Sequence, residues 1–246
     1  MEHRGPRVGA LSGPSSTEEG KASAFLKRGS LAAIAGSVVA LGGPVALLAL
    51  TGVRWAGLSR SSSSTYTAEG LLVVAGAVLL LIALLLYRRA FVHLKHVDPR
   101  LKPVALLCLV GSAGAIVLVV VGAIVASGPA GLTGCLGGHP THLLGCLRSK
   151  DPTAGYLSVV GFWLLWAGAA GLAAGLIVSG RHFGRPAMTA GGIVYAVLAA
   201  ELVEPFAALV VPLALTAYAV GAAPVAAVTG ATLVYLGARS GLRRDG

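Results

Sequence analysis

The sequence predicts an all-α integral membrane protein, a polytopic bundle of six transmembrane helices with both termini in the cytoplasm. Three observations lead to this fold class. The 246-residue chain is 56% hydrophobic and only 11% charged, whereas a soluble domain is about 25% charged. Its apolar residues gather in long runs with few or no charges, as bilayer-crossing helices require. Its basic residues are concentrated in alternate connections, which is the pattern that orients membrane helices.

The clearest apolar run covers residues 156–179 and contains no charged side chain. A helix of this length extends roughly 36 Å, enough to cross a hydrocarbon core of about 30 Å. Lipid tails are as apolar as leucine, so helices in a bilayer associate mainly where small residues let their backbones approach. Small residues recur here at seven-residue intervals beginning at Ala154, with a GxxxG pair beside them. We therefore expect a helix-packing seam formed by Gly161, Gly168, Gly171 and Gly175.

The other runs are assigned in the same way. The six helices are expected at residues 31–52, 69–87, 103–127, 156–179, 188–209 and 213–236. The stretch that begins at residue 188 is about 50 residues long, and a single helix of that length would extend about 75 Å. It must therefore fold back, with a turn between Pro205 and Pro212.

The chain divides into one membrane domain and two tails. Residues 1–29 are expected to be a disordered cytoplasmic tail and a basic approach to the membrane, because they lack apolar periodicity. The six-helix domain is expected at 30–238, followed by a short basic tail at 239–246. No secretory signal precedes the first apolar run, so we expect the first helix to act as an uncleaved anchor.

The distribution of Lys and Arg sets the orientation. The N-terminal tail, the 88–102 connection, the 180–187 turn and the C-terminal tail together hold 15 of the 19 basic residues. The 53–68 and 128–154 connections hold the other four. Because cytoplasmic loops carry the excess of Lys and Arg, both termini are predicted to be cytoplasmic. An odd number of helices would destroy this partition.

Glu201 and Glu204 are the acidic pair within the last apolar stretch. Their i, i+3 spacing places them on one helix face, and a carboxylate inside a membrane helix is a candidate ion or proton site. The structural alternative is a helix end near Pro205, where both acids reach headgroup water or pair with basic residues of the outer loops. Both interpretations remain open at this point.

The longest connection contains two cysteines and two histidines. Cys135 and Cys146 would face an oxidising exterior, which favours a disulfide that stabilises the loop by roughly 3 kcal/mol. Together with His139 and His142 they could instead form a tetrahedral zinc site or a copper site. A third possibility is that the loop carries neither. Cys108, inside an expected helix, is interpreted as a small buried apolar residue.

The 88–102 connection is the most charged, and its first half is expected to continue the second helix until Asp98-Pro99 ends it. Its basic residues are interpreted as topology anchors that also contact anionic lipid headgroups. These residues are Arg88, Arg89, Lys95, Arg100 and Lys102. His93 and His96, three residues apart, are a weaker candidate for a metal pair.

The sequence contains no Ser/His/Asp arrangement, P-loop, dinucleotide fingerprint, HExxH or CxxCH motif. Enzymatic activity therefore has no positive support, and no cofactor and no nucleic-acid partner are expected. The chain also lacks Asn and Gln entirely, which is part of the thermophile pattern; high-GC codon usage and a large embedded fraction would also lower their number.

Three segments resemble an uncharacterised archaeal multi-pass membrane-protein family that carries a domain of unknown function. They are KRGSLAAIAGSVVALGG, YRRAFVHLKHVDPRLK and LVYLGARSG, and the resemblance covers most of residues 25–241. It implies the multi-pass architecture and a source in a hot archaeal environment. The family has no assigned activity, and the loop from Cys135 to Cys146 is not part of the resemblance.

Together these observations predict a multi-pass protein of the cell membrane whose partners are the lipid bilayer and other membrane subunits, or copies of itself, bound through the glycine seams. The leading hypothesis is a non-enzymatic accessory or scaffolding subunit of a membrane assembly. The alternative is a small transporter or channel that uses Glu201 and Glu204. A metal-dependent activity of the outer loop is a third hypothesis.

Overall fold

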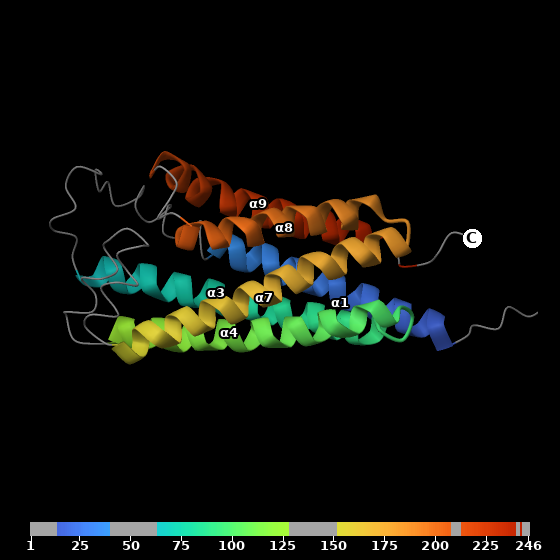
Figure 1. Ribbon diagram of the computed structural model, residues 1–246, viewed down its shortest axis with the longest axis horizontal. Coiled ribbons are helices and arrows are strands. Elements are labelled where there is room, and N and C mark those ends of the chain that lie inside the picture. Colours follow the sequence, from blue (N-terminus) through green and yellow to red (C-terminus); the bar gives the residue numbers. More distant parts are fainter. Residues whose placement is uncertain (1–13, 40–62, 128–151, 208–212, 240–241, 243–246) are drawn as a thin grey trace, which may run out of the picture.

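The structure is a computed structural model that describes residues 14–39, 63–127, 152–207, 213–239 and 242 (Figure 1). Within these residues the chain forms helices and no strands, which confirms the all-α fold class. The elements are α1 (Pro14–Ser37), α3 (Ser63–Leu94), η3 (Pro99–Leu101), α4 (Lys102–Ser127), α7 (Pro152–His182), α8 (Pro186–Ala207) and α9 (Leu213–Arg239).

Three helical stretches in the described part of the chain are long and apolar enough to cross a membrane. They are Ala75–Leu94, Pro99–Val121 and Gly155–His182. Two shorter apolar stretches, Pro186–Ala200 and Val225–Arg239, lie in α8 and α9. The side chains of α4 agree with a lipid environment, because Leu106 is 61% exposed and Ile116 and Val120 are each 50% exposed. These features support a membrane protein.

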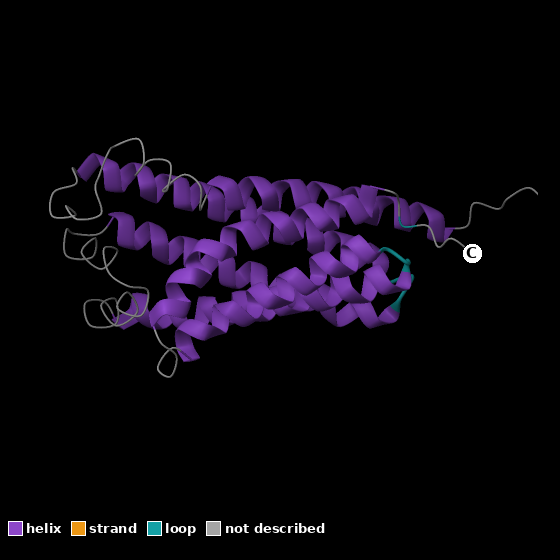
Figure 2. Ribbon diagram, turned by 90° about the horizontal axis from the view of Figure 1, so that it is seen from above, coloured by secondary structure: helices purple, strands orange, loops and turns teal. Residues whose placement is uncertain are grey.

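The six helices form a closed ring. Each helix packs against the helix before it and the helix after it in the chain, and α9 returns to pack against α1. Successive helices run in opposite directions, as Figure 1 shows, and Figure 2 shows that the helices extend along the long axis of the molecule. Ser23 on α1 helps to close the ring, because its hydroxyl donates a 2.8 Å hydrogen bond to the carbonyl of Ala238 on α9.

One end of the bundle gathers four parts of the chain, and we call it the basic end. It holds the start of α1, the connection between α3 and α4, the turn between α7 and α8, and the end of α9 (Figure 1). These are the segments that carry most of the Lys and Arg residues in the sequence.

The first helix differs most from the prediction. Residues up to Ala24 were expected to be a disordered tail, followed by a basic approach that ends at residue 29, yet α1 begins at Pro14 and continues through both segments. The buried face of α1 explains the difference, because apart from Leu26 it consists of small side chains that add little hydropathy. Its members recur three or four residues apart at Ala22, Leu26, Ser30, Ala33 and Ser37, and each is less than 5% exposed. The expected extension of this helix to residue 52 lies outside the described residues.

The other helices agree more closely with the prediction. The second helix continues through the basic segment to Leu94, as the amphipathic pattern indicated, and it ends four residues before Asp98. Helix α8 ends at Ala207 and α9 begins at Leu213. Most of the stretch from Pro205 to Pro212, where the turn was predicted, lies outside the described residues. The core of the described bundle includes Tyr87, Phe91 and Leu94 of α3.

Candidate functional site at the basic end of the bundle

The connection between α3 and α4 is a tight turn stabilised by its own residues. Asp98 caps η3: its Oδ1 accepts a 2.9 Å hydrogen bond from the backbone N–H of Arg100, and its carbonyl accepts from the N–H of Leu101. Pro99 then fixes the first position of η3. Leu101 is buried, which holds the turn on the bundle.

The five predicted anchor residues surround this turn. Arg89, Arg100 and Lys102 are exposed, while Arg88 and Lys95 are half-buried. Exposed basic side chains at the end of a membrane bundle are placed where anionic headgroups would lie.

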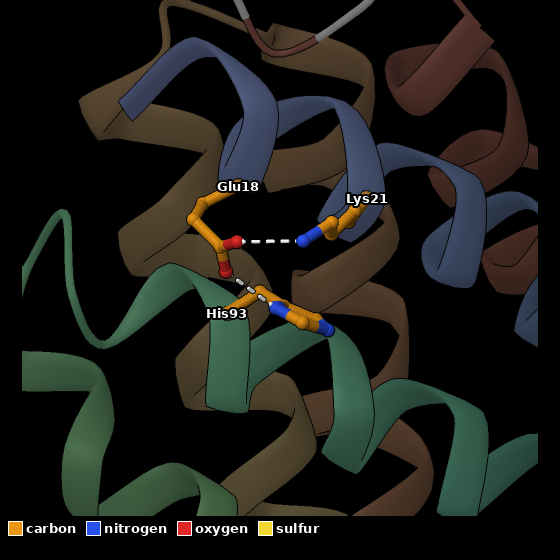
Figure 3. Close-up of polar contacts among 3 residues, drawn as sticks. All are labelled: Glu18, Lys21 and His93. Carbon is orange, nitrogen blue, oxygen red and sulfur yellow. Dashed lines mark hydrogen bonds and ion pairs between the residues drawn. The ribbon is translucent and has the colours of Figure 1, made fainter. Parts of the chain in front are cut away.

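The start of α1 is joined to the end of α3 by a cluster of three polar side chains (Figure 3). The carboxylate of Glu18 lies between Lys21 and His93, and it accepts hydrogen bonds from Lys21 Nζ at 3.0 Å and from His93 Nδ1 at 2.6 Å. Phe25, two turns after Glu18, stacks on the His93 ring with centroids 5.5 Å apart and planes 6° apart. Hydrogen bonding from His93, and next from Lys21, lowers the pKa of Glu18 below its ordinary value of 4.5.

The contact with Glu18 uses Nδ1 of His93, so a metal pair with His96 could use only Nε2 of His93. His182 at the end of α7 lies 3.9 Å from Asp98 Oδ2, so the α3–α4 turn also faces α7. Among the described residues, no group of three or more His, Cys, Asp or Glu side chains could hold a metal ion.

Three hydroxyl groups from three helices are connected by hydrogen bonds. Ser30 Oγ donates to the carbonyl of Leu26 at 2.9 Å, and the Ser30 and Tyr87 oxygens are 3.0 Å apart. Tyr195 on α8 also hydrogen-bonds to Tyr87. Because a hydroxyl has one proton to donate, the directions follow: Tyr195 donates to Tyr87, Tyr87 to Ser30, and Ser30 to the carbonyl. This hydroxyl chain links α8, α3 and α1.

The expected glycine seam lies against α4. A Cβ added at Gly168 would come closer than 3.0 Å to the Cα atom of Gly111, and one at Gly161 would be 3.2 Å from the carbonyl oxygen of Gly114. A Cβ added at Gly171 or Gly175 would meet side chains instead of backbone, and at Gly171 this side chain is Leu107. The four glycines therefore line the contact between α7 and α4.

Trp166 makes a polar contact that the sequence did not indicate. Its indole N–H donates a 2.8 Å hydrogen bond to the carbonyl of Ala199, which joins α7 to α8. Trp163, one turn earlier, meets Trp166 edge-on with ring centroids 5.8 Å apart.

The remaining predicted site residues cannot be placed in space. Cys135, His139, His142 and Cys146 lie outside the described residues, so the disulfide and the metal site both stay predictions. Glu201 and Glu204 belong to the last part of α8, but their side chains are not described. Cys108 is a buried free cysteine, as predicted.

Several residues of the observed cluster were missed because they belong to the segment expected to be disordered. The i, i+3 spacing of Glu18 and Lys21 and the small-residue period of Ala22, Leu26 and Ser30 could have indicated a helix there. No pattern in a single sequence indicates that His93 is the partner of Glu18, since the two are 75 residues apart.

Comparison of the chain with protein-family models, with curated proteins and with solved structures found no match. The resemblance to the archaeal multi-pass family therefore stays a prediction.

Proposed function

We propose that this chain is a non-enzymatic accessory or scaffolding subunit of a membrane assembly, embedded in the cell membrane through six crossings with both termini in the cytoplasm. The alternation of helix directions and the concentration of Lys and Arg at the basic end support this orientation. The three helical stretches of sufficient length and apolarity support the membrane location.

The observation that carries the scaffolding proposal is the use of polar side chains at the basic end. Glu18, Lys21 and His93 join α1 to α3, Ser23 joins α1 to α9, and Asp98 caps its own turn. These groups hold helices in place, so the basic end is a fixed surface. Such a surface, with exposed basic residues around it, suits the docking of an acidic partner.

Purification of the tagged full-length chain from native membranes in mild detergent tests this proposal. We expect a heteromeric complex of constant stoichiometry, measured by native mass spectrometry. Replacing Arg100 and Lys102 by Glu should weaken the complex, because both are exposed at the basic end. Leu106→Ala, an exposed change on the side of α4, is the matched control. A chain that purifies only as a homo-oligomer would contradict the proposal.

A transporter or channel is the second candidate, and the polar contacts of α8 favour it. Tyr195 reaches the hydroxyl chain, and the carbonyl of Ala199 accepts from Trp166 only two residues before Glu201. Polar groups inside membrane helices often mark a substrate or ion path. Ion flux into vesicles should fall in the Glu201→Gln and Glu204→Gln double variant. Unchanged flux with unchanged folding would remove this candidate.

A further inference from the structure

A groove lies beside the turn between α7 and α8, at the basic end of the bundle. Its volume is about 410 Å³, and most of its lining is apolar. Arg181 and Arg185 line it near the turn, and Thr189, Ala190 and Ile193 line it along α8. The groove is separate from the predicted anchor residues, which belong to α3, η3 and α4.

The conformation of the turn between α7 and α8 fixes the backbone positions of the two arginines. Gly184 has a φ of 63°, in the left-handed region that favours glycine. The N–H of Gly184 donates to the carbonyl of Arg181 at 3.3 Å, and the N–H of Arg185 donates to the carbonyl of Gly180 at 2.7 Å. This pair of hydrogen bonds is the Schellman motif that closes helix C-termini. Arg181 and Arg185 are thus held on the two sides of one rigid turn.

The close packing of α7 and α8 keeps the groove near the surface. A Cβ added at Gly180 would lie 2.6 Å from the backbone nitrogen of Thr189, so the two helices touch through backbone at this point. The groove continues along the outside of α8. Ile193, eight residues after Arg185 and therefore about 12 Å further along the helix, is 51% exposed.

The groove therefore has two chemically different ends. Near the turn, the exposed guanidinium group of Arg181 offers fork-shaped donors that match the oxygens of a phosphate, and the half-buried Arg185 adds a second positive charge. The N-terminus of α8, which begins at Pro186, adds its positive dipole end. Further along α8, the exposed apolar wall matches a hydrocarbon chain. A soluble phosphate would use only the first end, whereas a phospholipid uses both.

We propose that this groove binds one anionic phospholipid, with its phosphate on Arg181 beside the positive charge of Arg185, and with an acyl chain along Ala190 and Ile193. The inference rests on the proposed location of the chain in a membrane, because α8 must then border lipid. An anionic headgroup is favoured over a zwitterionic one, because the charged side chains that line the groove, Arg181 and Arg185, are both positive.

Lipid binding to the full-length chain in nonionic detergent tests the proposal, with native mass spectrometry as the measurement. We expect one phosphatidylglycerol per chain to be retained in preference to phosphatidylcholine. Arg181→Gln should weaken retention about tenfold, because it removes a charge-assisted contact, and Arg181→Lys should weaken it less. Arg239→Gln is the matched control, since Arg239 is also exposed at the basic end but does not line the groove.

The apolar wall is tested separately. Ile193→Ser should reduce retention of phosphatidylglycerol, while Ile116→Ser, equally exposed on α4, should not. If Ile193→Ser has no effect and millimolar inorganic phosphate displaces the lipid, the site binds free phosphate and the proposal is wrong. If Arg239→Gln weakens retention as much as Arg181→Gln, the attraction is general charge and the proposal is also wrong. Carbonate extraction of the same variants reports membrane integration, so a failure of the groove and a failure of the membrane assignment are distinguishable.

Discussion

At the scale of single residues, the hydroxyl chain shows how polar groups are accommodated inside an apolar bundle. A buried hydroxyl without a partner costs free energy, and here each hydroxyl both accepts and donates except at the end that begins with Tyr195. The hydroxyl proton of Ser30 is donated to the carbonyl oxygen of Leu26. A backbone carbonyl in a helix can accept this second hydrogen bond because its oxygen has two lone pairs.

Removal of the Tyr87 hydroxyl, in the middle of the hydroxyl chain, is expected to destabilise the bundle more than removal of the Tyr195 hydroxyl at its start. Tyr87→Phe leaves Tyr195 without its acceptor and Ser30 without its donor, and we expect a loss of about 1–2 kcal/mol. Tyr195→Phe leaves the rest of the chain intact, and we expect about 0.5 kcal/mol, close to the mean for interhelical hydrogen bonds in membranes. Unfolding by SDS in mixed micelles measures both values. The reverse order would show that the assigned donor directions are wrong.

Glu18 makes the contact between α1 and α3 dependent on pH. Its pKa is lowered in the folded chain by hydrogen bonding from His93 and from Lys21. A carboxylate with a depressed folded pKa contributes stability above its ordinary pKa, and the contribution is lost as pH falls through the lowered value. The stability difference between wild type and Glu18→Gln should therefore be complete above about pH 5 and disappear in more acidic solution.

The melting temperature of both proteins, measured in detergent across this pH range, checks the dependence on Glu18. Glu19→Gln is the matched control, because it removes the same charge from the adjacent position of α1. Parallel pH profiles for the Glu18 and Glu19 variants would contradict the assignment of the effect to the contact with His93.

At the scale of helices, the environment of each glycine determines what a methyl group does there. Gly168→Ala places a Cβ against the backbone of Gly111, and neither helix can move away without disturbing the ring. We expect a destabilisation of about 1–3 kcal/mol, as for other overpacked sites. Gly20→Ala meets nothing within 4 Å, so the higher helix propensity of alanine should stabilise α1 by about 0.5–1 kcal/mol. SDS unfolding compares the two, and equal effects would contradict the proposed contact between α7 and α4.

The helices also show which features a single sequence can predict. The uncharged run of α7 and the break at Asp98-Pro99 depend on length, hydropathy and local backbone chemistry, and both are visible in the sequence. The start of α1 depends instead on small residues such as Ala22 and Ser30, which are buried because another helix covers them. Hydropathy cannot distinguish such a helix from a polar tail.

The polar contacts between helices were less predictable than the helices. The contact between Glu18 and His93 joins α1 to α3, and the contact between Trp166 and the carbonyl of Ala199 joins α7 to α8. Their pairing depends on the rotation of each helix about its axis and on its displacement along that axis. Neither quantity follows from the spacing of apolar residues in one chain, so a site built from such contacts was found only in the structure.

At the scale of the whole molecule, the alternating helix directions make the two ends of the bundle chemically different. Helices of alternating direction place every other connection at the basic end, where Lys and Arg are concentrated. The energetic cost of moving basic connections across a bilayer then resists inversion of the molecule. The proposed docking of a cytoplasmic partner at the basic end requires such a single orientation.

Cysteine labelling in intact cells tests this orientation directly. In a chain whose native cysteines are replaced by Ser, we expect Tyr156→Cys, at the exposed start of α7, to react with a membrane-impermeant maleimide added from outside. Arg100→Cys, exposed in η3 at the basic end, should react only after the membrane is permeabilised. The length of α4 separates the two positions, and that helix is one of the three that are long and apolar enough to cross a membrane. Equal labelling of both positions from outside would contradict the crossing of α4, and with it the placement of the basic end in the cytoplasm.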